Sequence, residues 1–426
     1  MRATLLASWL LSAATLAAQD TTGLQLHALH QRASGADPRA QQVALLRQQA
    51  ALRLDNLSAE LRPAFSSEVL AQYQSDVVHV PIPGGPVPPH DTYDARIGLA
   101  QRILDPGYRA RRALISAQAA QTESAVAVRL YGNRQQVNDA FFAALLAQEQ
   151  QDELRATISA LEAQLALAAN RVREGAALPS EEATVRAELL RRRQMLVDAG
   201  NSRVASLTVL SDLTGQAIDT TQRLAIPALE RAVSLARTNM PQQARARPEY
   251  AELDAARLVL DRQDAARRAQ DLPRVGAFGR AGYGRPGLNP LSETFDSYWL
   301  AGVQLQWSPF SWGATRRDRE INVAQRRILD TEAEALDHTI ARAVTRELAT
   351  IDRLRAALAL DADIIALRER IAAETQIRYT ESAVTAAEVI ERHTDLLAAR
   401  ITHAVHRVEL AHASARFLTI MGLETR

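Results

Sequence analysis

The side chains that could do chemistry in this sequence are scattered histidines and carboxylates. His403 and His406 are spaced i, i+3, with His393 and His412 on the same segment, which is a conceivable arrangement for a metal site. Histidines on the surface of a long helix give the same spacing, and we expect that here. The sequence has no cysteine, which excludes disulfides, thiolate metal ligands, a cysteine nucleophile and a lipid anchor on cysteine.

Sequence motifs for catalysis or nucleotide binding do not occur. There is no phosphate-binding loop, nucleophile elbow or His-Glu-x-x-His segment, and Gly276, Gly279 and Gly282 are spaced wrongly for a dinucleotide loop. The net charge is +1, and the run Arg191-Arg192-Arg193 is expected to be a solvated helix face. We therefore expect no catalytic residue, no metal, no cofactor and no nucleic-acid partner, so the protein is not expected to be an enzyme.

The N-terminus has the pattern of a secretory signal. Arg2 is followed by an apolar run from Leu5 to Leu16 and by the small residues Ala17 and Ala18, which predicts a signal peptide over residues 1–18. No later apolar run reaches the ~18 residues that a transmembrane helix needs. We expect an exported protein whose insertion into a membrane would have to use β-strands.

Most of the remaining sequence predicts long helices. Leu154, Ile158 and Leu161 begin a series of apolar residues spaced four and three apart, which is typical of a coiled-coil seam. Proline is absent from Gly107 to Leu178 and from Ala314 to the C-terminus. A single helix from Arg109 to Arg173 would be roughly 100 Å long at ~1.5 Å per residue.

Four short segments alternate instead with period two, which predicts strands. Each has an apolar face, as in Trp299, Val303 and Leu305, and a polar face. The length of each suits a tilted strand crossing an outer membrane, ~9–11 residues. Tyr and Trp residues cluster around the third and fourth segments, as at a membrane–water interface. Two hairpins folded over a soluble core remain the alternative.

The four strands also predict an oligomer. Four strands cannot close a barrel, and lipid does not tolerate an open edge. Two copies would give 8 strands with an interior filled by side chains, whereas three would give 12 strands around a lumen. The many polar inward residues favour the trimer, and the candidates for facing its lumen are Arg96, Arg102, Arg274, Arg280, Gln304 and Gln306.

The sequence is an internal duplication. A shift of 207 residues aligns Leu213-Thr214-Gly215 with Ile420-Met421-Gly422. We divide the chain into the signal peptide, a first repeat (19–215), an equatorial linker (216–248) and a second repeat (249–426). The first repeat has an N-terminal helix, a β-hairpin at about 64–104 and long helices at about 106–215 with a tip at about 174–180. The second repeat has an ascending helix at about 249–271, a β-hairpin at about 273–309 and long helices at about 313–422 with a tip at about 380–386.

Several segments, taken in order, resemble the TolC-like outer-membrane efflux protein family. Asp37-Pro38-Arg39 opens the first helix, Leu104-Asp105-Pro106-Gly107 leaves the second strand, Arg247-Pro248-Glu249-Tyr250 starts the ascending helix, and residues 307–313 (WSPFSWG) leave the fourth strand. The resemblance covers nearly the whole mature chain. It implies a mainly α fold with a membrane β portion: a homotrimer with a 12-stranded β-barrel in outer-membrane lipid, continued through the periplasm by a 12-helix α-barrel.

The same resemblance implies a function and partners. Such proteins are passive exit ducts for tripartite efflux pumps or type I secretion systems, and they receive cargo from an inner-membrane transporter through a periplasmic adaptor. The family's tips dock the adaptor and gate the pore. Onto this sequence the docking role maps to Arg171, Gly175, Leu178, Glu181, Glu182, Arg378, Ser382 and Val384.

The candidates for the pore constriction are Tyr379, Glu388 and Glu391. Glu388 and Glu391 are spaced i, i+3 and share a helix face, so three copies would gather six carboxylates. A solvated helix start, where the helix dipole favours acidic residues, gives the same pattern. The chain has Ser382 and Val384 where the family pattern has Gly and Arg, so the tip latch is altered.

Two other functions are weighed against the channel. A periplasmic coiled-coil adaptor or structural protein would have the long helices without a membrane barrel. An exported helical enzyme has no support beyond scattered carboxylates.

Overall fold

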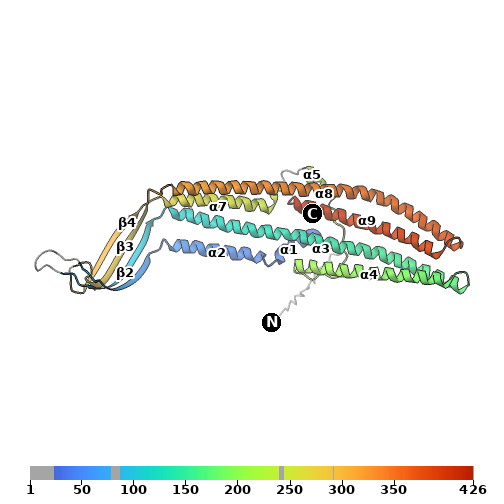
Figure 1. Cartoon of the computed structure of the whole chain (residues 1–426), viewed down its shortest axis with the longest axis horizontal. Coiled ribbons are helices and arrows are strands. Elements are labelled where there is room, and N and C mark those ends of the chain that lie inside the picture. The colour runs from blue at the N-terminus through green and yellow to red at the C-terminus, as the bar shows by residue number, and fades with distance from the viewer. Residues whose placement is uncertain (1–23, 78–86, 239–243, 291, 426) are drawn as a thin grey trace, which may run out of the picture.

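The computed structural model describes residues 24–77, 87–238, 244–290 and 292–425. The described chain is an elongated rod, with the strands at one end and two helical hairpins at the other (Figure 1). The predicted signal peptide lies outside the described residues. So do residues 78–86, between the first two strands, and residues 239–243 of the predicted linker.

Two long helical hairpins and two β-hairpins make up the rod. The first half contains α1 (Leu26–Ala36), α2 (Ala40–Ala59), β1 (Ala64–Tyr73), β2 (Asp91–Leu104), α3 (Gly107–Arg173) and α4 (Pro179–Thr214). The second half contains α5 (Glu230–Thr238), the short 3-10 helix η1 (Ala244–Ala246), α7 (Pro248–Gln270), β3 (Arg274–Arg285), β4 (Asp296–Gln306), α8 (Ala314–Thr380) and α9 (Ala386–Ile420).

The duplication seen in the sequence is present in the structure. Helices α3 and α8 have 67 residues each, and their starts, at 107 and 314, differ by 207. Helices α4 and α9 begin at 179 and 386, with the same offset. Gly215 and Gly422, which follow these two helices, both have positive φ. The two halves therefore repeat one hairpin-and-helix unit.

The N-terminal region differs from the single helix that the sequence analysis expects. Asp37 ends α1 with extended backbone, and α2 begins after Pro38 and Arg39. Proline disfavours helical backbone in the residue before it, which explains the break. The Asp37 carboxylate is bound by the guanidinium of Arg39 and the amide of Asn133, and hydrogen bonding to Arg39 lowers the pKa of Asp37. The Asp37-Pro38-Arg39 segment therefore opens α2.

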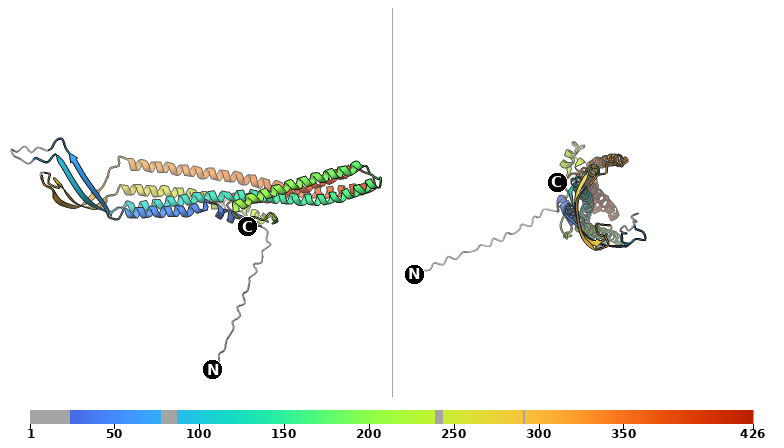
Figure 2. Two further views of the ribbon diagram at one scale, coloured as in Figure 1. Left: turned by 90° about the horizontal axis from the view of Figure 1, so that it is seen from below. Right: turned by 90° about the vertical axis from the view of Figure 1, so that its left-hand side faces the viewer.

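The helices form one layer whose order changes along the rod. In the half nearest the tips, α3 and α9 lie in the middle, with α4 packed on α3 and α8 packed on α9. In the half nearest the strands, α3 and α7 lie in the middle, with α2 and α8 outside them. Helices α2, α4 and α8 are therefore the edges of the layer. Figure 2 shows this layer and the sheet following an arc when seen end-on.

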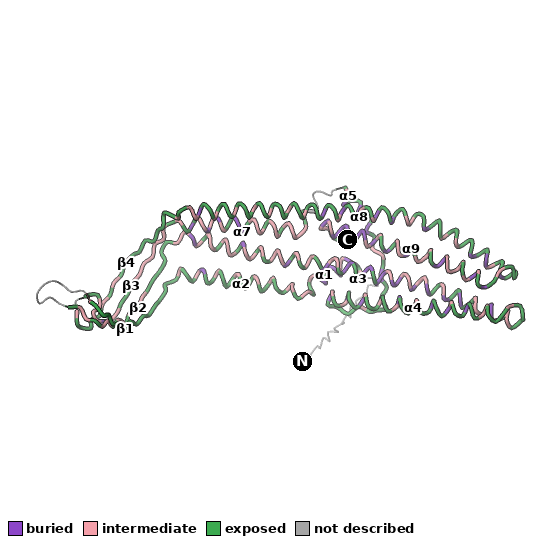
Figure 3. Tube along the Cα trace, in the orientation of Figure 1, coloured by how far each residue is buried: buried purple, intermediate pink, exposed green. Residues whose placement is uncertain are grey.

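The largest buried core lies half-way along the rod (Figure 3). Here α1 and α5 pack onto the long helices, and Phe141, Phe142, Phe417 and Leu418 are fully buried. A single layer of helices exposes most of its surface, so these short helices supply the second layer that a core needs.

A polar network crosses this core and joins α1 to both repeats. His30 Nε2 lies 2.8 Å from Asn138 Oδ1, and Asn138 Nδ2 donates to Thr419 Oγ1 at 3.1 Å. His30 Nδ1 lies 3.3 Å from the Thr425 hydroxyl. These partners fit a neutral imidazole with its proton on Nε2. The pKa of His30 is lowered from 6.5 to about 4, mainly by burial and in part by the nearby charge of Arg134.

We expect His30 to make stability fall in mild acid. Because the folded pKa lies below the unfolded one, the unfolded chain binds the proton first, and stability is lost as pH falls from 6.5 towards 4. The loss is about 2–3 kcal/mol of unfolding free energy. His30→Gln should remove this component in chemical denaturation at pH 7.5 and pH 4.5. An equal acid loss in both proteins would contradict the assignment.

The strands form one antiparallel sheet in the order β1-β2-β3-β4. Phe65 is opposite Leu99, Leu99 is opposite Gly279, and Gly279 is opposite Ala301. Directly opposed residues project to the same face, so the apolar residues of all four strands share one face. A bulge between Arg102 and Leu104 makes Leu104 the partner of Val275. None of the described helices has an apolar stretch long enough to cross a bilayer.

Candidate functional site

The six residues predicted to face a lumen all lie on the polar face of the sheet. Arg96 is opposite Glu68 and forms an ion pair with it at 2.6 Å, and it also lies 3.4 Å from Asp94. Arg102 pairs with Glu60, at the end of α2, at 2.5 Å. The others are Arg274, Arg280, Gln304 and Gln306. This face therefore carries charged and amide side chains, of which Arg96 and Arg102 form ion pairs.

The opposite face of the sheet is apolar and open. Phe65, Val69 and Trp299 are 79%, 82% and 76% exposed, and no helix of the described chain covers them. Ile97, Val303 and Leu305 on the same face are also exposed. A contiguous apolar patch of this kind marks a surface that contacts another molecule or a membrane.

The two tip turns have the same hydrogen bonds. Ala176 N donates to Arg171 O, and Ala383 N donates to Arg378 O, both at 2.8 Å. Gly175 and Ser382 occupy equivalent places, with φ of 72° and 60°. Left-handed backbone favours glycine, so Ser382 is held there against its own preference. Leu178 and Arg378 are exposed, and Glu182 pairs with Arg186 at 2.7 Å.

A contact between the two helical hairpins lies next to these turns. The Arg171 guanidinium covers the ring of Tyr379, 4.4 Å from its centroid. Arg171 also donates to Tyr379 O at 2.9 Å and to Ser382 Oγ at 3.1 Å. The Tyr379 hydroxyl lies 3.4 Å from the Glu181 carboxylate. These contacts connect α3 and α4 to the end of α8 and to Ser382 in the turn that follows it.

Tyr379 itself is fully buried, with none of its surface exposed. It packs among apolar residues of both hairpins, including Ile158, Val185 and Val389, with Val384 at the edge of this cluster. Burial raises the pKa of Tyr379, so its hydroxyl stays protonated at neutral pH. Tyr379 therefore has no free surface to present to a lumen in this conformation, in contrast to Glu391, which is exposed, and Glu388, which is half-buried.

The comparisons with known proteins agree with this arrangement. A family model described as outer membrane efflux protein matches residues 240–423, which include most of the second repeat. The predicted resemblance to the outer membrane efflux proteins is confirmed. No curated protein matches the sequence.

Solved structures match the efflux-protein-like fold over nearly the whole chain. VceC of Vibrio cholerae has 14% identity and a TM-score of 0.66, over 94% of this chain and 97% of VceC. MtrE of Neisseria gonorrhoeae has 15% identity and a TM-score of 0.66, over 94% of this chain and 89% of MtrE. CmeC of Campylobacter jejuni has 15% identity and a TM-score of 0.64, over 95% of this chain and 86% of CmeC. All three are outer-membrane proteins, which agrees with the predicted localisation.

A second contact between the hairpins was missed by the sequence analysis. Arg192, expected to be solvated with its neighbours, has a side chain only 6% exposed, whereas Arg191 and Arg193 are exposed. It pairs with Glu188 and donates to Thr394 Oγ1 on α9 at 2.9 Å. The i, i+4 spacing of Glu188 and Arg192 was the available signal.

Three of the four histidines differ from a simple surface interpretation. His412 Nε2 lies 2.9 Å from Asp139 Oδ1, and its ring stacks on Phe142. His406 Nδ1 lies 2.6 Å from the buried carboxylate of Asp361, and His403 Nδ1 lies 3.9 Å from it. No group of three metal-ligating side chains occurs within the described ranges. By the offset of 207, Asp361 and His406 correspond to Leu154 and Ala199, which form an apolar layer in the first hairpin. The second hairpin thus replaces apolar packing with a polar pair.

Replacing Asp361 and His406 by the residues at the equivalent positions of the first hairpin, Leu154 and Ala199, should be tolerated. Replacing a buried polar pair by packed apolar residues is commonly neutral or stabilising by about 1–4 kcal/mol. We expect Asp361→Leu with His406→Ala to unfold at the wild-type temperature or above. His406→Ala alone should be destabilised, by up to about 3–5 kcal/mol, because it leaves Asp361 without its closest partner. Thermal denaturation in detergent distinguishes these outcomes; a double variant weaker than the single one would contradict them.

Proposed function

We propose that this chain is the subunit of a trimeric outer-membrane channel that serves as the exit duct of an efflux pump or secretion system. The open apolar face of the sheet is the observation that carries this proposal. Burying Phe65, Val69 and Trp299 in lipid removes a surface that would otherwise favour aggregation in water. The polar face then lines the water-filled side.

Aromatic residues at both ends of the sheet support its insertion in a membrane. Trp307, Phe310 and Trp312 are exposed where β4 leads to α8. At the other end Phe295 stacks with Tyr93 and Tyr283, at 6.2 and 5.8 Å between ring centroids. Aromatic girdles at the two interfaces are typical of outer-membrane strands.

The edges of the molecule support a ring of copies. Strands β1 and β4 are each paired on one side only within the protomer. Three copies of a four-stranded sheet would close a barrel of 12 strands, wide enough for a lumen lined by Arg96, Arg102 and Arg280. Two copies would give a barrel whose interior is filled by side chains, which does not suit these arginines.

The edge helices have matching apolar seams. On α8, Leu360, Ile364, Leu367 and Ile371 are exposed at heptad spacing, and on α4 Leu190, Val197 and Val204 are exposed seven residues apart. Because α8 and α4 lie at opposite edges of the layer, α8 of one copy would pack against α4 of the next. This head-to-tail contact closes a ring of 12 helices in the tip half.

The tip would gate this duct and dock a periplasmic adaptor, which connects it to an inner-membrane transporter. Gly175, Leu178 and Arg378 offer exposed surface for docking, and the contact of Arg171 with Tyr379 would hold the tip closed. Glu388 and Glu391 remain the candidates for an acidic ring at the constriction.

The acidic ring makes a specific prediction. Glu388→Gln with Glu391→Gln should weaken the block of the pore by multivalent cations, because six carboxylates would be lost from the trimer. Single-channel recordings with a trivalent cation measure this block. Glu182→Gln, at an acidic residue paired with Arg186, is the control and should leave the block unchanged. Equal block in all three proteins would remove Glu388 and Glu391 from the constriction.

Fractionation and bilayer recording test the function itself. The protein should be found in the outer-membrane fraction, run as a heat-labile trimer after detergent extraction, and conduct ions in planar bilayers. A monomer that is released with the periplasm would overturn the proposal and favour the adaptor or structural protein.

A further inference from the structure

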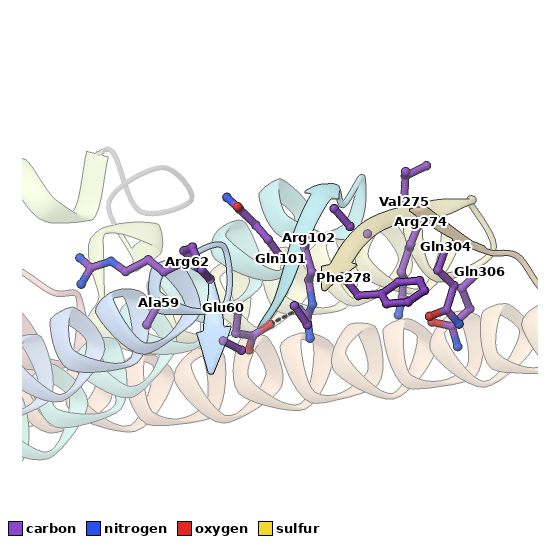
Figure 4. Close-up of a pocket in the computed structure, with 15 residues that line it drawn as sticks. Ala59, Glu60, Arg62, Gln101, Arg102, Arg274, Val275, Phe278, Gln304 and Gln306 are labelled. Carbon is purple, nitrogen blue, oxygen red and sulfur yellow. Dashed lines mark hydrogen bonds and ion pairs between the residues drawn. The ribbon is translucent and has the colours of Figure 1, made fainter. Parts of the chain in front are cut away.

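The polar face of the sheet contains a hollow of about 470 Å³ where the strands meet the helices (Figure 4). Its wall comes from the end of α2 and from strands β2, β3 and β4. The charged and amide side chains that line it are Glu60, Arg62, Gln101, Arg102, Arg274, Gln304 and Gln306.

The lining of this hollow contains more arginine side chains than carboxylates. Glu60 is the one acidic residue of the lining, and it pairs with Arg102 at 2.5 Å, whereas Arg111 of α3 lies closer to Asp105, at 2.7 Å, than to Glu60. Arg62 and Arg274 have no ion-pair partner within the described parts of the chain. The hollow therefore has a positive charge that the protomer does not neutralise.

Hydrogen-bond donors are also left free there. The Nε of Arg274 is buried and makes no hydrogen bond to any described residue. Arg274 is opposite Gln306, and the next residue on the same face of β3, Gly276, is opposite Gln304. Gly276 has no side chain to fill the space between them. Guanidinium and amide N–H groups thus border an open, positively charged space.

We propose that this hollow binds an oxyanion, a carboxylate or phosphate group, of solutes passing through the channel. Arginine binds such groups with paired N–H donors, and a buried donor without a partner gains most from the contact. The inference rests on the proposed function, which places the polar face around a lumen. Three copies would then form a belt of arginines, and this level of the channel favours anionic cargo.

Bilayer recordings of the whole protein test the belt. Inorganic phosphate should reduce the wild-type current. In a KCl gradient, Arg274→Gln should move the reversal potential towards cation preference relative to the wild type, since the acidic ring at the tip is the same in both proteins. Arg274→Gln should weaken the phosphate block about tenfold, the scale expected for loss of one charge-assisted hydrogen bond. Arg274→Lys keeps the charge, so it should keep the wild-type reversal potential while losing part of the block. Arg231→Gln, on α5, removes the same charge away from the sheet and should leave both properties unchanged.

The outcomes separate this inference from the proposed function. A channel whose reversal potential and phosphate block are the same with Arg274→Gln as in the wild type overturns the anion site and leaves the channel standing. A wild-type protein that forms no channel overturns both. Heat-labile trimers of each variant establish that a lost block does not come from misfolding, and citrate in place of phosphate tests whether carboxylates bind as well.

Discussion

Val303→Arg is expected to prevent the protein from assembling in the outer membrane. Val303 lies on β4, opposite Ala277, in the open apolar face of the sheet. An arginine on the lipid side of a membrane strand costs about 2–4 kcal/mol near the middle of the bilayer, and a trimer would contain it three times. The yield of heat-labile trimer in the outer-membrane fraction should fall close to zero.

The neighbouring residue provides the matched control. Gln304 precedes Leu305 on the same strand but projects to the polar face, opposite Gly276. Gln304→Arg adds the same side chain one position along, where water would solvate it, and should assemble normally. Normal assembly of Val303→Arg would mean that the apolar face does not contact lipid, and the channel proposal would then lose its main support.

Tyr379→Ala is expected to destabilise the tip and open it. The substitution removes a fully buried ring from the cluster between the hairpins and the surface on which Arg171 lies. Loss of a large buried aromatic costs about 3–5 kcal/mol. Because the cluster joins the two hairpins, the loss of stability should loosen the tip. The expected results are a higher conductance in bilayers and greater sensitivity of cells to bulky antibiotics.

Tyr379→Phe distinguishes the contribution of the aromatic ring from that of the hydroxyl group. The hydroxyl lies 3.4 Å from Glu181, a long hydrogen bond, so Phe should keep most of the stability and most of the closure. Arg171→Gln should loosen the tip by a different route, since it removes the bonds to Tyr379 O and Ser382 Oγ. If Tyr379→Ala folds but conducts as the wild type does, the contact is structural and does not gate the channel.

The amino-acid sequence determined the local structure of this protein. The spacing of Leu154, Ile158 and Leu161 predicted a helix core, and all three are buried in α3. The alternation of Trp299, Val303 and Leu305 with Gln304 and Gln306 predicted the two faces of β4. These patterns can be read directly because side-chain direction repeats with a fixed period along a helix or strand. The offset of 207 residues predicted two like repeats for the same reason.

Only the tertiary structure decided which elements are neighbours. Arg192 looks like Arg191 and Arg193 in sequence, yet it is buried because α9 happens to cover that side of α4. Tyr379 was a candidate for the pore constriction, and only the structure shows that packing of the two hairpins encloses its ring. Asp361 and His406 meet only because α8 and α9 fold back on each other. Such contacts join residues far apart in the chain, and they depend on the free energy of packing whole elements together, which no local periodicity records.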